Sequence, residues 1–263
     1  MCIRDRYPGQ FYALPQAPQQ FKQLLMISGF DRYFQIAPCF RDEDSRADRS
    51  PGEFYQIDIE MSFITQDDLF VELEELMVRL FKELSNKKIV AETFPRIPYR
   101  DAMEKYGVDK PDIRYGLEMV DLTDLFIESE FKVFAGAAQS GGAVKVINAK
   151  GAAGRPRKFF DDAESFAIHA GAKGLAWIAV RDGELKGPIV KFLSEGERQA
   201  MLERACAEDG DALFFGAGER AVTNELMGKV RVYLGNALER IDRSLAAFCW
   251  VVDFPTVSYT HLR

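Results

Sequence analysis

Histidine and cysteine are scarce in this chain of 263 residues, which has two histidines and four cysteines. No two cysteines have the CxxC spacing of zinc sites, and the only imidazoles belong to His169 and His261. The sequence therefore predicts neither a metal site nor a disulfide framework. We expect reduced thiols in a cytoplasmic protein.

Long hydrophobic runs are also missing. The apolar segments at residues 175–180 and 246–252 are far shorter than the ~20 residues that cross a bilayer. The first residues lack the charged, apolar and small-residue succession of a secretory signal. We therefore expect no membrane partner.

An excess of basic charge is lacking as well, because 34 lysines and arginines face 41 acidic residues and give a net charge of −7. This balance disfavours a protein that coats nucleic acid nonspecifically, and we expect no DNA partner. Any contact with RNA would have to be local. The 47% hydrophobic content is ample for a core, and the length suits one large or two moderate domains.

The clearest pattern that is present lies between residues 33 and 63. Apolar and polar side chains alternate along residues 55–63, as expected of a strand with one apolar and one polar face. Residues 33–40 predict a partner strand, and the long charged loop between the strands contains Pro51-Gly52. The predicted polar face carries Gln35, Arg41, Glu43, Gln56, Asp58 and Glu60. A loop at the edge of such a sheet is a common place for ligand contacts.

A short helix is predicted just before this hairpin, at residues 18–28. Pro18 suits a first helical turn and Gly29 suits a helix end. Gln19 and Lys22 share one face of this helix by their spacing, so an amide and an ammonium can point into a neighbouring site. The alternative is a lysine that lies exposed on an amphipathic helix.

Beyond the hairpin, Thr65 and Asp68 predict a capped helix over residues 66–84. Prolines then break the chain up to residue 115, and residues 135–142 are expected to form a loop connecting two strands rather than a phosphate-binding loop. His169 is expected to pair with backbone carbonyl groups. Strands are predicted at residues 143–147, 175–180, 212–215 and 248–255, and helices at residues 158–169, 194–208 and 221–234.

Residues 40–43, the charged loop and residues 54–60 resemble motif 2 of the class II aminoacyl-tRNA synthetases, and residues 39–63 are similar to the bacterial aspartyl enzymes in particular. Residues 12–25 resemble the amino-acid-binding segment of that family. The resemblance implies an α+β fold, with part of the antiparallel synthetase sheet and its flanking helices, plus an inserted α+β domain of the GAD type. The implied boundaries are 7–112 for the partial catalytic core, 113–246 for the insertion and 247–255 for the return strand, with residues 1–6 and 256–263 expected to be non-native ends.

The resemblance also implies a reaction in which L-aspartate attacks ATP to form aspartyl-adenylate and is then transferred to the 3′ end of tRNA. Arginine suits such a site because its planar fork binds phosphate and carboxylate oxygens bidentately. Arg41 is therefore the implied catalytic residue, in contact with the α-phosphate, and the implied ATP-binding set is Arg41, Asp42, Glu43 and Ser50. The implied aspartate-binding set is Gln19, Gln20, Phe21, Lys22, Gln56 and Asp58. Arg46 and Arg49 would approach the tRNA acceptor end.

The same resemblance implies several partners. ATP is a substrate, Mg²⁺ accompanies it with ligands outside this chain, and the acceptor is tRNA(Asp), while the sequence leaves open whether tRNA(Asn) is charged as well. A homodimer is implied for the full-length enzyme, whereas this fragment alone is expected to be inactive because the motif 3 arginine is missing. The alternative is a non-catalytic, synthetase-like RNA-binding module. A class II relative that activates another carboxylate is disfavoured by the Gln19 and Lys22 pairing.

Overall fold

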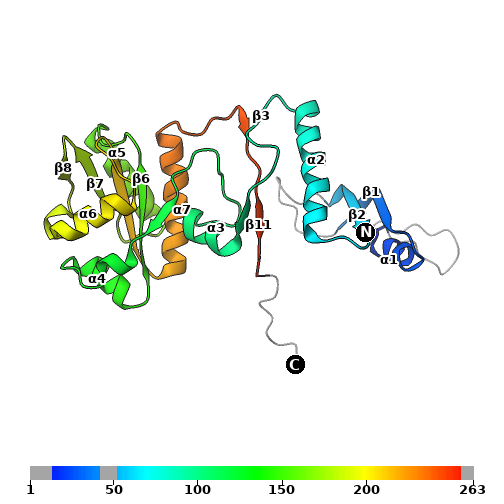
Figure 1. Ribbon diagram of the computed structural model, residues 1–263, viewed down its shortest axis with the longest axis horizontal. Coiled ribbons are helices and arrows are strands. Elements are labelled where there is room, and N and C mark those ends of the chain that lie inside the picture. Colours follow the sequence, from blue (N-terminus) through cyan, green and yellow to red (C-terminus); the bar gives the residue numbers. More distant parts are fainter. Residues whose placement is uncertain (1–13, 42–51, 256–263) are drawn as a thin grey trace. The chain divides into compact units, whose positions relative to one another are not determined.

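The computed structural model describes residues 14–41 and 52–255, which fall into two compact units divided after Glu75. We describe each unit by itself (Figure 1). The elements of the first unit are α1 (Gln19–Ile27), β1 (Arg32–Phe40), β2 (Glu53–Met61) and the first half of α2 (Gln66–Leu84).

Strands β1 and β2 pair antiparallel over their full lengths, which confirms the predicted hairpin. Gln35 lies opposite Asp58 and Ala37 lies opposite Gln56, so these side chains share one face. This polar face contains the buried residues of the hairpin, whereas Phe34 on the other face is 74% exposed. The apolar face of the hairpin is therefore the solvent-exposed face of this unit.

Helix α1 begins after Pro18 and ends at Ser28, with Gly29 at a φ of +99°, as its sequence predicts. Lys22 is directed toward the hairpin, because its ammonium contacts Asp58. Phe21, by contrast, is 73% exposed. The polar face of the helix, not its apolar side, therefore meets the sheet.

Helix α2 begins with the predicted cap. The backbone N–H of Asp68 donates to the Thr65 hydroxyl, and the Asp68 carboxylate accepts from the backbone N–H of Thr65 at 2.8 Å. These bonds satisfy two N–H groups that the first helical turn leaves unpaired. They also hold the pKa of Asp68 below its ordinary value.

The second unit contains a five-stranded antiparallel sheet in the order β5-β6-β9-β7-β8. Its strands are β5 (Met119–Asp121), β6 (Ala143–Ala149), β7 (Ala176–Arg181), β8 (Glu184–Lys186) and β9 (Ala212–Gly218). The helical elements around it are α3 (Tyr99–Tyr106), η1 (Thr123–Phe126), α4 (Lys132–Gln139), α5 (Arg157–His169), η2 (Val190–Phe192), α6 (Glu195–Arg204) and α7 (Arg220–Ala237).

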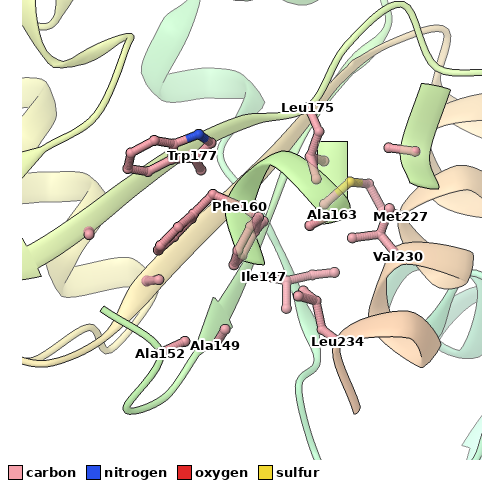
Figure 2. Close-up of a cluster of buried hydrophobic side chains, with 14 of the residues drawn as sticks. Ile147, Ala149, Ala152, Phe160, Ala163, Leu175, Trp177, Met227, Val230 and Leu234 are labelled. Carbon is pink, nitrogen blue, oxygen red and sulfur yellow. The ribbon is translucent and has the colours of Figure 1, made fainter. Parts of the chain in front are cut away.

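Both faces of this sheet are covered, which explains why its central strands are apolar at successive positions. Ile147 and Phe214 belong to a cluster with side chains of α5 and α7, including Phe160 and Leu234 (Figure 2). Their strand neighbours, among them Phe215, join the opposite cluster with side chains of η1, α4 and α6. The result is a sheet between two helical layers (Figure 1).

The predicted loop at residues 135–142 is wrong in its first half, since α4 (Lys132–Gln139) is helical. Its alanines are strong helix formers, and Gly136 is the single glycine inside the helix. Phe134 anchors the helix on the sheet, with its ring centroid 5.7 Å from that of Phe215. Tertiary packing here outweighs the glycine-rich composition.

The other predicted elements are found with ends shifted by a few residues. His169 lies at the end of α5, and its Nδ1 is 2.7 Å from the carbonyl oxygen of Ser165, as expected of a histidine paired with backbone. Within the described ranges, no helix is both long and apolar enough to cross a membrane.

The segments that flank the five-stranded part come together in two short parallel pairs. Strand β3 (Lys88–Ile89) pairs with β10 (Leu245–Ala246), and β4 (Arg96–Pro98) pairs with β11 (Trp250–Val252). The chain therefore leaves and returns at one place. That topology is consistent with an inserted domain, although the predicted domain boundaries remain a prediction.

An ionic cluster around the buried Lys145 connects α3 with the five-stranded sheet. Lys145 on β6 is 1% exposed and forms ion pairs with Glu104 of α3 and Asp121 of β5. The guanidinium of Arg220 lies 2.9 Å from the first carboxylate and 2.7 Å from the second, and Asn224 donates to Glu104. Burial raises the pKa of both carboxyl groups, but hydrogen bonds and the neighbouring cations outweigh it, so both pKa values lie below their ordinary range.

We expect this cluster to make the free energy of unfolding decrease as the pH falls below about 4.5. Because the folded pKa values of Glu104 and Asp121 are lowered, the unfolded chain binds more protons in this range. The stabilisation is complete above the unfolded values and is lost as the pH falls through the folded ones. Urea unfolding between about pH 6 and pH 3 should show a flatter profile for Glu104→Gln than for the exposed control Glu128→Gln. Parallel profiles for the parent chain and Glu104→Gln would contradict this assignment.

Candidate functional site

The polar face of the hairpin carries a lysine clamped between two carboxylates. Lys22 of α1 lies with its Nζ 2.8 Å from Asp58 Oδ1 and 2.6 Å from Glu60 Oε1. The side chains of Lys22 and Asp58 are 12% and 6% exposed. The hydrogen bond to Asp58, and then that to Glu60, raise the pKa of Lys22, so the group stays an ammonium.

This cluster carries a net negative charge, because one ammonium faces two carboxylates. Asp58 Oδ2 is buried and has no hydrogen-bond partner among the described residues. A buried oxygen of this kind is costly unless a donor reaches it. The arrangement therefore suits a ligand group that donates hydrogen bonds and carries positive charge, such as an amino group.

Gln56 lies beside the cluster on the same strand face. Its Nε2 is 3.5 Å from Asp58 Oδ1, and its Oε1 is 3.7 Å from the buried Cys39 Sγ. The thiol and the carboxylate together orient the amide, with its NH₂ group toward Asp58. The amide thereby places an uncharged polar group beside the cluster.

Arg41 lies at the end of the same face, just beyond the last residue pair of the hairpin. Its backbone N–H donates to the carbonyl oxygen of Gly52 at 2.8 Å, and its guanidinium lies 5.1 Å from the ring centroid of Phe54. Phe54 and Asp58 share a strand face and are about 13 Å apart at the usual rise of an antiparallel strand. This spacing gives room for a cationic subsite next to the lysine cluster.

The structure brings together some of the residues that the sequence indicates. Lys22, Gln56 and Asp58 meet directly, and Arg41 lies on their face, whereas Gln19, Gln20 and Phe21 are exposed on α1. The remaining candidates, Asp42, Glu43, Arg46, Arg49 and Ser50, lie outside the described residues. The roles of all these residues in binding remain predictions.

Two contacts were missed by the sequence reasoning. Glu60 binds Lys22 as closely as Asp58 does, and Cys39 contacts the amide of Gln56. The first follows from the period of two along β2, since Asp58 and Glu60 share a face. The second depends on the register of the hairpin, which the sequence of either strand alone does not give.

Comparison with known proteins gives a consistent result. The chain matches the family of tRNA synthetases class II (D, K and N) over residues 2–262. It is 56% identical over 250 residues to an aspartate–tRNA ligase of Streptomyces coelicolor, covering 95% of this chain and 42% of that protein. It is 55% identical over 253 residues to an aspartate–tRNA(Asp/Asn) ligase of Prosthecochloris aestuarii, covering 96% of this chain and 41% of that protein.

The chain thus spans about two fifths of the length of these curated relatives. Their names are those of ligases, which does not favour the non-catalytic module as an interpretation. The match to the family extends over both compact units and includes the hairpin that carries the lysine cluster. The chain belongs to the class II tRNA synthetases of the D, K and N group.

Proposed function

We propose that this chain is part of an aspartate–tRNA ligase. In the first reaction, an α-carboxylate oxygen of L-aspartate attacks the α-phosphorus of ATP, aspartyl-adenylate forms, and pyrophosphate leaves. In the second, the 3′-terminal ribose hydroxyl of tRNA takes the aspartyl group and AMP leaves. The observation that carries the proposal is the ammonium of Lys22 held between Asp58 and Glu60, on the same sheet face as Arg41.

In this proposal Lys22 binds the side-chain carboxylate of the substrate, and Gln56 lies near the substrate ammonium. The carboxylates of Asp58 and Glu60 position Lys22 and keep it charged. L-Asparagine would place a neutral amide against this ammonium, so the substrate side chain would form no ion pair with Lys22. Such a mismatch costs far more than a missing methylene, so the clamp favours aspartate.

Arg41 supplies the positive charge for the phosphate end of the reaction. Nucleotidyl transfer places extra negative charge on the α-phosphate in the transition state, and a fixed guanidinium stabilises that charge. The contact with Phe54 limits the conformations of the Arg41 side chain. No nucleophilic side chain is required, because the substrate carboxylate is the nucleophile.

Mg²⁺ would accompany ATP and offset the charge of its phosphates. The described residues contain no group of three or more His, Cys, Asp or Glu side chains suited to hold a metal ion. No step of the proposed reaction is assigned to a protein-bound ion. Lys22 of α1 and Arg41 after β1 supply the cationic groups that we assign to the substrates.

The proposed acceptor is tRNA(Asp), and the name of the Prosthecochloris relative adds tRNA(Asn) as a second acceptor. A cytoplasmic homodimer is the corresponding proposal for the complete ligase. For this chain alone we propose that adenylate formation does not occur. Exchange of labelled pyrophosphate into ATP by the purified 263-residue chain would contradict that part of the proposal.

Lys22→Met is expected to abolish the preference for aspartate. We expect L-aspartate to bind the chain at least about 10-fold more tightly than L-asparagine, and the two affinities to become equal within about twofold in the variant. Calorimetric titration of each amino acid measures both affinities. Lys229→Met, which removes an exposed lysine from α7, should leave the preference unchanged.

Two outcomes of this titration would count against the proposal. An unchanged preference in Lys22→Met would remove Lys22 from the aspartate site. Equal affinity for the two amino acids in the parent chain would contradict the assignment of the whole cluster. The same comparison in a full-length ligase that carries Lys22→Met extends the test to adenylate formation by pyrophosphate exchange.

A further inference from the structure

One stretch of the second unit has a charge pattern opposite to that of the whole chain. Residues 131–160 contain no aspartate or glutamate, although the chain has 41 acidic residues and a net charge of −7. The cations of this stretch are Lys132, Lys145, Lys150, Arg155, Arg157 and Lys158. Four of these cations, Lys150, Arg155, Arg157 and Lys158, lie at the turn between β6 and α5, at residues 150–158.

The turn is anchored firmly and displays its charges outward. Ala152 and Ala153 are fully buried against the core shown in Figure 2, whereas Lys150 and Arg155 on either side of them are exposed. The carboxylate of Asp211 accepts from the backbone N–H of Gly151 at 2.9 Å and fixes the start of the turn. A preformed turn loses little conformational entropy when a ligand binds.

Two more arginines from distant parts of the chain join this turn. Arg181 at the end of β7 donates to the carbonyl oxygens of Ala153 and Arg155. Arg240, after α7, donates to the carbonyl oxygen of Lys150 at 2.9 Å. The backbone of the turn therefore holds two guanidinium groups beside its own cations, and we call the resulting surface the basic turn, made of Lys150, Arg155, Arg157, Lys158, Arg181 and Arg240.

Half of these cations lack an acidic partner. Arg155, Arg181 and Arg240 form no ion pair with any described residue, and Arg155 instead lies 5.9 Å from the ring centroid of Phe159. The other three do have partners: Arg157 pairs with Asp161, Lys158 pairs with Asp162, and Lys150 lies 3.8 Å from Asp211. These residues give the surface an excess of positive charge.

The position of these cations also works against helix stability. Arg157 and Lys158 occupy the first turn of α5, which has no acidic residue and no side-chain cap. Cations at the positive end of a helix are unfavourable by a few tenths of a kcal/mol to about 1 kcal/mol. A polyanion bound at this surface would reverse that cost.

We propose that the basic turn binds the phosphate backbone of RNA. Guanidinium groups held by backbone carbonyls match phosphate oxygens in charge and in planar geometry. Residues 150–158 contain no large apolar side chain that could insert into a lipid bilayer, which favours nucleic acid over a membrane surface. The choice of RNA as the partner rests on the proposed function, because the relatives are named as tRNA ligases. This assigns a role to the five-stranded domain and goes beyond the chemistry proposed for Lys22.

The test is RNA binding by the 263-residue chain at several salt concentrations. A fluorescent blunt RNA duplex of about 12 base pairs serves as the probe, because it lacks a single-stranded acceptor end. The variant Lys150→Gln/Arg155→Gln/Arg240→Gln removes three cations of the basic turn. The matched control Lys132→Gln/Lys191→Gln/Lys229→Gln removes three cations from α4, η2 and α7.

We expect the basic-turn variant to bind at least about 10-fold more weakly at low salt, and the slope of log K against log salt concentration to decrease in magnitude by about 2. The control should change the affinity by less than about twofold, and both variants should keep the urea midpoint of the parent chain. Equal loss in the two variants, unchanged binding in the basic-turn variant, or stronger binding of the parent chain to anionic vesicles than to RNA would each overturn the proposal. If the parent chain binds RNA as expected but does not prefer L-aspartate to L-asparagine, that result would count against the proposed function and not against the basic turn.

Discussion

Gly107→Ala is expected to lower the free energy of unfolding of the second unit by about 4 kcal/mol. Gly107 ends α3 at a φ of +70°, a conformation that costs an L-residue about 1–2 kcal/mol. An added Cβ would lie 2.1 Å from the carbonyl oxygen of Asn224 and 2.8 Å from Gly228 Cα, both of them backbone atoms of α7. The two helices would have to separate, and overpacking of this kind typically costs a further 1–3 kcal/mol or more.

Urea unfolding of the 263-residue chain measures this change, with two matched controls. Gly141→Ala has a similar φ of +76° but no atom within 4 Å of the added Cβ, so it isolates the conformational cost of about 1–2 kcal/mol. Gly196→Ala lies in α6 with open space around it and should be stabilising by up to about 1 kcal/mol. If Gly107→Ala costs no more than Gly141→Ala, α3 and α7 are not in the close contact described here.

The same contact affects the ionic cluster. Asn224 lies on α7 next to Gly107 and donates to Glu104 of α3, which binds Lys145. Separation of the helices would therefore weaken the cluster as well as the packing. Because these sites share partners, we expect the effects of Gly107→Ala and Glu104→Gln to be non-additive.

The hairpin was predictable because its signal is local. A period of two along residues 55–63 and a long polar loop specify two strands and a common polar face, and the observed register agrees. The burial of the faces was not predictable in the same way. Which side of a sheet is covered depends on the elements that pack against it, and in this unit Lys22 of α1 reaches the polar side.

In the five-stranded sheet, too, some features have a local signal in the sequence and others do not. Its central strands were found because side chains that are buried on both faces give continuous apolar runs. The strand order β5-β6-β9-β7-β8 has no local signal, since β9 lies between two strands that precede it in the chain. Helix α4 was missed because its glycine and the glycines that follow it are typical of a loop. The packing of Phe134 on the sheet, which stabilises the helix, has no local signal in the sequence.

The candidate site was predictable to the extent that one strand and one helix define it. Asp58 and Glu60 follow from the alternation along β2, and Lys22 follows from its place on a short helix beside the hairpin. Their approach to hydrogen-bond distance depends on tertiary structure, and so does the burial of Lys145 and Arg231. Charged side chains in the core have no sequence signature, because an identical lysine or arginine is usually exposed.

Arg231→Lys is expected to destabilise the second unit by about 3 kcal/mol although it keeps the charge. Arg231 of α7 is 1% exposed, and its guanidinium donates to the carbonyl oxygens of Asp112 and Gly116 and to the hydroxyl of Tyr115. The Cζ atom lies 4.2 Å from the ring centroid of Tyr115 and 4.8 Å from that of Tyr106. A single ammonium has neither the fork that reaches these acceptors nor the planar face that stacks on the rings.

Burial lowers the pKa of Arg231, which shows that solvation of this cation is largely replaced by the protein. Lysine would keep the desolvated charge and lose most of its compensation, whereas methionine would lose the charge and leave only the carbonyl groups unpaired. We therefore expect Arg231→Met to cost no more than Arg231→Lys. Urea unfolding gives the order, and Lys229→Met on the exposed side of α7 is the control.

A second measurement separates the hydrogen bonds of Arg231 from its general packing. The acceptors of Arg231 lie in the loop at residues 112–116, which also contains Arg114, a residue after which trypsin can cleave. Loss of the hydrogen bonds from residue 231 to the loop should raise the rate of cleavage at Arg114 in both variants. This cleavage should occur through local opening of the loop, under conditions in which the unit stays folded. If Arg231→Lys retains the stability and the protease resistance of the parent chain, then charge alone, and not the guanidinium fork, holds this loop against α7.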